Sequence, residues 1–252
     1  MYEAIRYARP YLKETIARVD FIIAVNLDSA LPSRLTTVAS KHFPIVEPID
    51  TPVKKINISE RNLSQQQTNL RQWNFYDRDR EKQLTLTSSY AFVSCKKYAT
   101  YENIKGDFGA IIDELQKTFP DVKAARFGLR YINNIEINGL KSPTDWSLYI
   151  NEFLLKPVDF FENKINLTRL FHVAELKYED IDIKFQFGMP NPDYPASIKR
   201  PIFVLDLDGY VQCAHSLSDS LTYMDKAHEQ IQYLFEKSIT DKLREGMNGN
   251  ST

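Results

Sequence analysis

A period-2 alternation over residues 126–137 is the feature that most constrains the fold of this chain. On one side of the alternation lie the apolar residues Phe127, Leu129, Tyr131, Ile135 and Ile137. On the other side lie Arg126, Gly128, Arg130, Asn134 and Glu136, a set rich in cations and amides. This pattern predicts a β-strand that buries one face against a core and turns the other face outward.

The composition favours packed sheet in an ordinary globular protein. Hydrophobic residues make up 43% of the 252 residues, and 15 Phe and 14 Tyr stand against only 8 Gly. The chain has 32 Lys and Arg and 33 Asp and Glu, for a net charge of −1. Because this total gives no overall positive field, a dedicated nucleic-acid-coating protein is not expected.

Apolar periodicity and capping residues predict an α+β fold in which the order strand, helix, three strands, helix occurs twice. The first set comprises a strand over 19–26, a helix capped by Ser29, strands over 54–59, 70–76 and 84–98 with a break near Ser88, and a helix from Thr100 to Pro120. The second set comprises a strand over 122–137, a helix over 145–155, strands over 165–178, 181–187 and 201–213, and a helix over 221–239. We therefore predict two related lobes, 1–120 and 121–245, each an antiparallel sheet packed on helices, followed by a disordered tail, 246–252.

Two short matches support this duplication. The run 55–59 (Lys-Ile-Asn-Ile-Ser) resembles 164–168 (Lys-Ile-Asn-Leu-Thr), and 91–95 (Ala-Phe-Val-Ser-Cys) resembles 209–213 (Gly-Tyr-Val-Gln-Cys). A cleft between two such lobes would be the default binding site.

The run 203–210 looks like the signature of haloacid-dehalogenase phosphatases, in which Asp206 would attack phosphorus and Asp208 would act as acid and base. That signature belongs on the first strand of a parallel sheet, whereas this run lies about 40 residues before residue 252. We therefore favour a strand that ends in a hairpin turn at Asp208-Gly209. A magnesium-dependent phosphohydrolase remains the weakest of three functional hypotheses.

Other catalytic and metal-binding patterns find no support in the sequence. His172 and Glu175 are three apart on a predicted strand, so they point to opposite faces and do not converge on a metal. Cys95 and Cys213 fall within predicted strands and are expected to be buried thiols, too few for a disulfide framework. We predict no metal, no cofactor and no catalytic residue, and we lean away from an enzyme.

The candidate site residues are Arg126, Arg130, Asn133 and Asn134. Two guanidinium groups on one strand face could hold a phosphate or carboxylate. They could instead pair with carboxylates of neighbouring strands, such as Asp182, and stabilise the sheet. Asn133 falls on the apolar face, where a buried amide must find hydrogen-bond partners.

The run Gly128-Leu129-Arg130-Tyr131-Ile132-Asn133 resembles the core of an uncharacterised, patchily distributed bacterial and archaeal family. Weaker likenesses to that family span 9–21, 98–102 and 205–208, so the resemblance covers most of the chain. The family has no established catalytic residues, so the resemblance implies no activity. Its distribution resembles that of mobile-element or defence genes.

We expect a non-catalytic interaction or regulatory protein with a protein partner, linked to a microbial defence or toxin-control system. The alternative is a sensor that holds a small anion, such as a nucleotide, between the lobes. No apolar run reaches the roughly 18 residues that cross a bilayer, so we expect a cytoplasmic protein and no membrane. A homodimer through exposed edge strands is left open.

Overall fold

The structure of this chain is a computed structural model that describes residues 5–59, 62–98, 100–140, 142 and 144–248. Of residues 53–59 and 62–69 it describes the backbone alone. The strands are β1 (Leu12–Phe21), β2 (Ile45–Ser59), β3 (Asn62–Tyr76), β4 (Lys82–Leu86), β5 (Tyr90–Cys95), β6 (Lys123–Glu136), β7 (Leu170–Lys177), β8 (Asp182–Met189), β9 (Ile202–Val211) and β10 (His215–Ser216). The helices are α1 (Ser33–His42), α2 (Tyr101–Thr118), α3 (Glu152–Asp159), α4 (Asp219–Ser238) and α5 (Asp241–Asn248), with a 3-10 turn, η1 (Lys164–Asn166).

The strands form one antiparallel sheet, which confirms the predicted α+β class. Its hydrogen-bonded order is β2-β3-β4-β5-β1-β6-β9-β8-β7, and β10 pairs with β6. In the edge strand β2, Pro48 and Pro52 lie opposite Trp73 and Asn69 of β3. Proline has no N–H to donate, so it fits in a strand where its backbone nitrogen points away from the neighbouring strand. Backbone groups of residues four apart in a strand point the same way, so the nitrogens of both prolines face the free edge of β2.

The chain forms two compact units, each assembled from separated segments. Unit 1 comprises Met1–Thr15, Gly128–Val211 and Asp225–Thr252, and unit 2 comprises Ile16–Phe127 and Gln212–Met224. Strands β1 and β6 and helix α4 each contribute residues to both units. The duplication and its boundary near residue 120 stay predictions.

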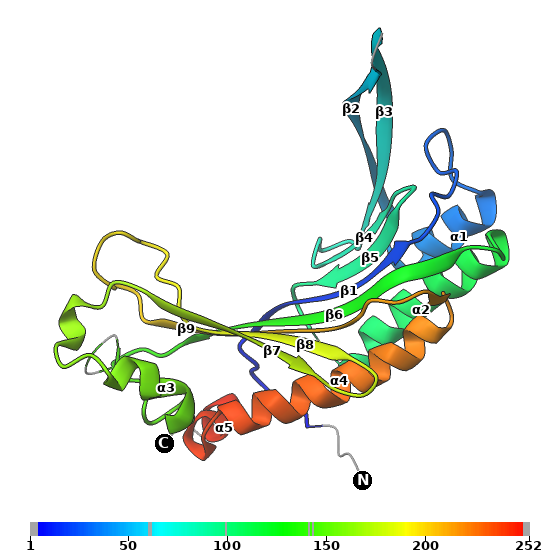
Figure 1. Ribbon diagram of the computed structural model, residues 1–252. Coiled ribbons are helices and arrows are strands. Elements are labelled where there is room, and N and C mark those ends of the chain that lie inside the picture. The colour runs from blue at the N-terminus through cyan, green and yellow to red at the C-terminus, as the bar shows by residue number, and fades with distance from the viewer. Residues whose placement is uncertain (1–4, 60–61, 99, 141, 143, 249–252) are drawn as a thin grey trace. The chain divides into compact units, whose positions relative to one another are not determined.

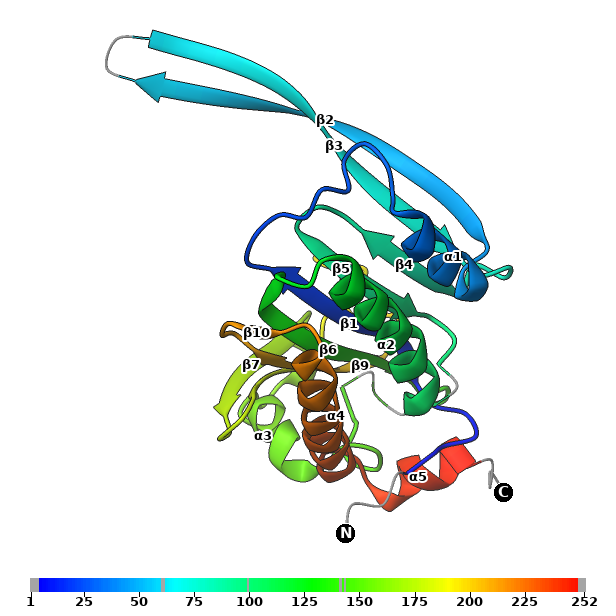
Figure 2. The ribbon, with the colours of Figure 1, turned by 90° about the vertical axis from the view of Figure 1, so that its right-hand side faces the viewer.

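In unit 2, α2 begins and ends where its sequence predicts. The Thr100 hydroxyl caps the helix by accepting a hydrogen bond from the Asn103 N–H, at 3.2 Å. The helix ends at Thr118, just before Pro120. Figures 1 and 2 show α1 and α2 on one face of the strands of this unit. The buried face of α2 is formed by Ile104, Phe108, Ile111, Ile112 and Leu115.

Two predicted helices begin elsewhere. Helix α1 begins at Ser33, directly after Pro32, and Ser29 lies outside it. Helix α3 begins at Glu152 instead of near residue 145, because the Asn151 side chain caps it by accepting a hydrogen bond from the Phe153 N–H. The predicted break near Ser88 is confirmed, since β4 and β5 are separate strands there.

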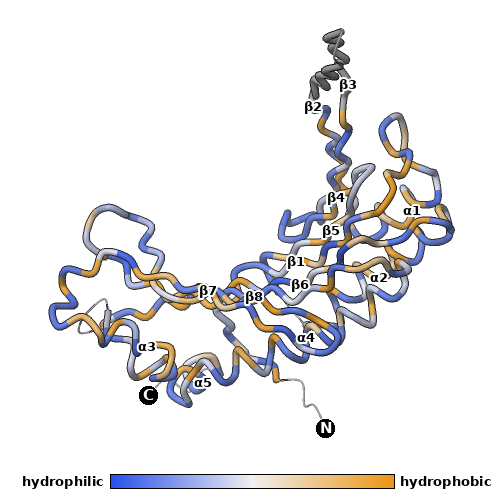
Figure 3. The backbone as a smooth tube through the Cα atoms, viewed as in Figure 1, coloured by the Kyte–Doolittle hydropathy of each residue, from blue (hydrophilic) through white to orange (hydrophobic). Residues whose placement is uncertain are grey.

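In unit 1, α4 packs closely on β9 at Gly209. A Cβ added to Gly209 would lie 2.9 Å from the Cβ of Ala227 and 3.0 Å from Cδ1 of Ile183. The expected turn at Asp208-Gly209 is therefore wrong: β9 continues to Val211, and the glycine is explained by the approach of the helix. Figure 3 shows hydrophobic and hydrophilic residues alternating along strands of this unit.

The end of the described chain also belongs to unit 1. Residues 246–248, which we expected in a disordered tail, are part of α5, and Met247 is buried. The carbonyl of Met247 accepts a hydrogen bond from the Arg9 N–H at 2.8 Å. The remaining tail residues, 249–252, lie outside the described residues.

Candidate functional site

The candidate site lies on the outward face of β6 in unit 1. The predicted alternation is confirmed, because Leu129, Tyr131 and Ile135 are buried whereas Arg130 and Asn134 are partly exposed. Among the described helices of this unit, none covers the outward face (Figure 1). The polar side chains of β6 therefore meet only side chains of neighbouring strands, loops or solvent.

Arg130 is held by a carboxylate of β9. Its Nε and Nη2 donate hydrogen bonds to Oδ1 and Oδ2 of Asp206, at 2.8 and 2.5 Å. The Asp206 side chain is 8% exposed and that of Arg130 is 41% exposed. The hydrogen bond with Asp206, more than the nearby charges of Asp208 and Glu14, raises the pKa of Arg130 despite its partial burial. The guanidinium is thus a permanent cation, and the edge formed by its Nε and Nη2 is occupied by Asp206.

This pair bears on the two interpretations of Arg130, as a site for an external anion or as part of a salt bridge that stabilises the sheet. We expected either a bound external anion or a carboxylate such as Asp182, and the partner is Asp206. Asp182 instead begins β8, where it lies opposite Lys177 of β7 and Tyr210 of β9. The bidentate geometry leaves Asp206 poorly placed to act as a nucleophile, because both of its oxygens accept hydrogen bonds from Arg130.

The two asparagines have different environments. Asn133 is 5% exposed, and its amide donates a hydrogen bond to the Leu205 carbonyl at 3.1 Å. That contact satisfies the expected need of a buried amide and ties β6 to β9. Asn134 faces outward, and its backbone N–H donates to the Tyr11 carbonyl at 2.9 Å.

Asn134 lines a hollow of about 350 Å³ on the same outward face. Its lining is Lys13, Glu14, Ile132, Asn134, Phe171, Pro190 and Val204. This volume lies at the lower end of the range of small-molecule sites, roughly 300–1,000 Å³. Apolar walls with one ammonium, one carboxylate and one amide suit a small molecule that has both apolar and charged parts.

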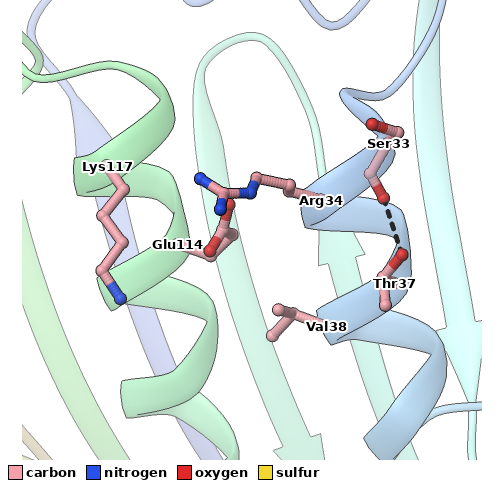
Figure 4. A pocket seen from close by; sticks show the side chains of 6 residues that line it. All are labelled: Ser33, Arg34, Thr37, Val38, Glu114 and Lys117. Atoms are coloured by element: carbon pink, nitrogen blue, oxygen red, sulfur yellow. Dashed lines mark hydrogen bonds between the residues drawn. The ribbon is translucent and has the colours of Figure 1, made fainter.

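Arg126 belongs to unit 2 and is partly buried on the same β6 face. Unit 2 has its own hollow between α1 and α2, of about 480 Å³, lined by Ser33, Arg34, Thr37, Val38, Glu114 and Lys117. Figure 4 shows Arg34 extending toward Glu114, while the Thr37 hydroxyl donates to the Ser33 carbonyl at 2.9 Å. The Thr37 hydroxyl is thus already bonded within its own helix.

A cluster that the sequence did not predict joins α1, α2 and β4. Asp107 of α2 is bound by His42 Nδ1 at 2.9 Å and by Lys82 Nζ at 2.6 Å. His42 and Asp107 are 65 residues apart, so no local spacing signals the contact. The cluster fixes three elements of unit 2 to one another.

The remaining candidate groups have structural partners or lie apart. Cys95 is buried, which raises the pKa of its thiol and disfavours a thiolate. Cys213 is exposed beyond the end of β9, so its predicted burial is wrong. His228 Nδ1 lies 2.9 Å from the Tyr131 hydroxyl. Within the described part of the chain, no three His, Cys, Asp or Glu residues are grouped so that they could hold a metal.

The segment around α3 exposes large apolar side chains. Phe153 is 73% exposed. Phe160, the C-cap residue of α3, follows seven residues or about two turns later, so it lies near the same side of the helix, and it is 82% exposed. Leu155 and Val158 are buried on the other side, so α3 is apolar on two faces. The Phe160 and Phe161 rings touch, with centroids 5.4 Å apart, and Ile165 is also exposed. We call Phe153, Phe160, Phe161 and Ile165 the α3 surface.

No model of a known protein family matches this sequence, and no curated protein matches it either. The family resemblance carried by residues 128–133 therefore stays an expectation. None of the described helices has the length and apolar character needed to cross a membrane.

Proposed function

We propose that this chain is a non-catalytic interaction or regulatory protein that binds another protein through the α3 surface. The observation that carries the proposal is the exposure of Phe153 and Phe160, at 73% and 82%, on a helix whose opposite face is already buried. Grouped apolar side chains of this size on a surface mark interaction sites more often than isolated ones do. Phenylalanine is also among the residues enriched at protein interfaces.

The charges around the α3 surface favour a protein partner over nucleic acid or an anionic membrane. Residues 152–169 contain three acids and three bases, namely Glu152, Asp159, Glu162, Lys156, Lys164 and Arg169. Two of these charges form an ion pair with each other, since Lys164 Nζ lies 2.6 Å from Asp159 Oδ1. A segment without net charge does not attract the phosphate groups of nucleic acid or of an anionic membrane. Contact with an apolar patch on another protein does not depend on such an attraction.

Replacing Phe153 and Phe160 together by serine should weaken partner binding by at least about 100-fold, because two aromatic anchors are lost. The measurement is native mass spectrometry of protein purified gently from its own cells, which reports any partner held in stoichiometric amount. The matched control is Tyr233→Ser, which removes another exposed aromatic side chain of unit 1 and should leave the complex intact.

A partner that the Phe153→Ser/Phe160→Ser variant retains would contradict the proposal, as would wild-type protein without any stoichiometric partner. A link to a microbial defence or toxin-control system goes further and is supported by the family resemblance alone.

A second candidate function, a sensor of a small anion, is supported by the hollow beside Asn134. Since Arg130 is bound by Asp206, the groups left for an anion there are the Lys13 ammonium and the Asn134 amide. In the same mass spectra the wild type should then carry a small anionic ligand, and Lys13→Ala should lose at least about 90% of it, since one charge-assisted contact is worth roughly 1.5–3 kcal/mol. Lys156→Ala on α3 is the control. An empty wild type, or a ligand unaffected by Lys13→Ala, would argue against a sensor.

The order of elements supports the predicted duplication as part of this proposal. One half of the chain has the neighbouring strands β3-β4-β5-β1, and the other half has β7-β8-β9-β6. Each of these sets is followed in sequence by a long helix, α2 or α4. The match of 55–59 with 164–168 gives no support, because the first run lies in β2 and the second includes η1.

A further inference from the structure

β7 is an edge strand without the protection that β2 has. It pairs along all eight residues with β8, and in the strand order it has no neighbour on its other side among the described strands. It contains no proline, whereas two prolines face the free edge of β2. A strand of this length with free N–H and C=O groups is a template for pairing with another strand.

The side chains of β7 alternate between exposed and partly buried. Phe171, Val173, Glu175 and Lys177 are exposed on one face, and the two apolar members are 38% and 55% exposed. In the strand order β9-β8-β7, β7 is the outermost strand. The edge is thus accessible, and its exposed face is partly apolar.

We propose that two copies of this chain pair antiparallel through β7, with His172 of one copy opposite His172 of the other. Residues directly opposite each other in an antiparallel pair project from the same face, so odd positions meet odd positions. In this register Phe171 meets Val173 of the second copy, and Arg169 meets Glu175. Twofold symmetry repeats each of these pairs.

Neighbouring registers fit less well. A pair centred on Val173 sets Arg169 against Lys177, a like-charge contact. A pair centred on Ala174 sets the apolar Phe171 and Val173 against Lys177 and Glu175. The register centred on His172 is the one of the three that places opposite charges and apolar residues together.

Arg169 is positioned for this contact at the rim of the strand. It is exposed, directly before β7, and its guanidinium lies over the Tyr194 ring, 4.1 Å from the ring centroid. The charges favour a second copy of this chain as the occupant. An antiparallel partner strand needs an acid opposite Arg169 and a base opposite Glu175, and Glu175 and Arg169 of a second copy supply them. This surface is separate from the α3 surface, so the inference does not depend on the proposed function.

The test is sedimentation velocity of the full chain over a range of concentrations. Glu175→Arg sets two arginines against each other twice per dimer, so the dissociation constant should rise at least about tenfold. The double variant Arg169→Glu/Glu175→Arg restores opposite charges and should return the dissociation constant to near that of the wild type. Lys177→Glu is the control, because Lys177 meets the uncharged Leu167 in this register.

Val173→Lys is a second variant that should also weaken the dimer, and circular dichroism checks that each variant is folded. A wild type that stays monomeric at the highest concentration reached would overturn the proposal. So would a dimer that Glu175→Arg leaves unchanged, or one that the double variant fails to restore. The Phe153→Ser/Phe160→Ser variant should dimerise as the wild type does.

Discussion

Replacing Gly188 by alanine should lower the free energy of unfolding by at least about 3 kcal/mol. Gly188 lies near the end of β8 with φ of +135°, a conformation that residues with a side chain rarely adopt. A Cβ at this position would also lie 2.3 Å from the carbonyl oxygen of Leu170 on β7. Because that obstacle is backbone, the β7–β8 pair must separate locally to admit the methyl group. Urea unfolding followed by circular dichroism measures the loss.

The control for this experiment is Gly106→Ala. Gly106 lies within α2, and a Cβ there meets nothing within 4 Å. Alanine has the higher helix propensity, so this variant should gain roughly 0.5–1 kcal/mol. A Gly188→Ala variant as stable as the wild type would show that β7 and β8 are not paired in the register described.

The second large effect is expected from Arg130→Met, which should cost about 3 kcal/mol of stability. It removes the cation that forms an ion pair with the nearly buried Asp206 carboxylate. Asp206→Leu should cost less, about 1–2 kcal/mol, because Arg130 is 41% exposed and can turn toward water. The same urea unfolding measurement compares the two.

The double variant Arg130→Met/Asp206→Leu should recover most of the loss, since apolar side chains of similar size can replace a partly buried ion pair. Strong coupling between the two substitutions is the signature of direct pairing. If the two losses simply add, the ion pair does not determine the stability of this face, and Arg130 would again be a candidate for an external anion.

Local patterns in the sequence predicted much of the fold. The alternation along β6 and the Thr100 cap of α2 depend on residues within a few positions of one another, so the sequence shows them directly. The amide of Asn133 was recognisable as a buried group in need of a partner, and the Leu205 carbonyl is that partner. The capping side chain of Asn151 was the local signal for the start of α3, but the apolar residues before it suggested an earlier start.

The features that the sequence could not predict depend on distant residues. Arg130 and Asp206 are 76 positions apart, and nothing local distinguishes Asp206 from Asp182 as the partner. The same holds for His42 and Asp107. The dipeptide Asp208-Gly209 suggests a turn, and only the approach of α4 explains the glycine within a strand. The exposure of Phe153 and Phe160 was equally hidden, because a sequence cannot tell an exposed apolar face from a buried one.

The segmented make-up of the two compact units has a consequence for how the chain folds during synthesis. Unit 2 needs Gln212–Met224 in addition to Ile16–Phe127, so roughly 100 further residues must leave the ribosome before it is complete. At typical rates of about 5–20 residues per second, this wait lasts roughly 5–20 s. During that time, the side of α2 near Gly109 and Gln116, which Leu221 and Leu217 contact in the finished protein, lacks part of its cover. The nascent protein is thus most exposed to aggregation and to chaperones in this interval.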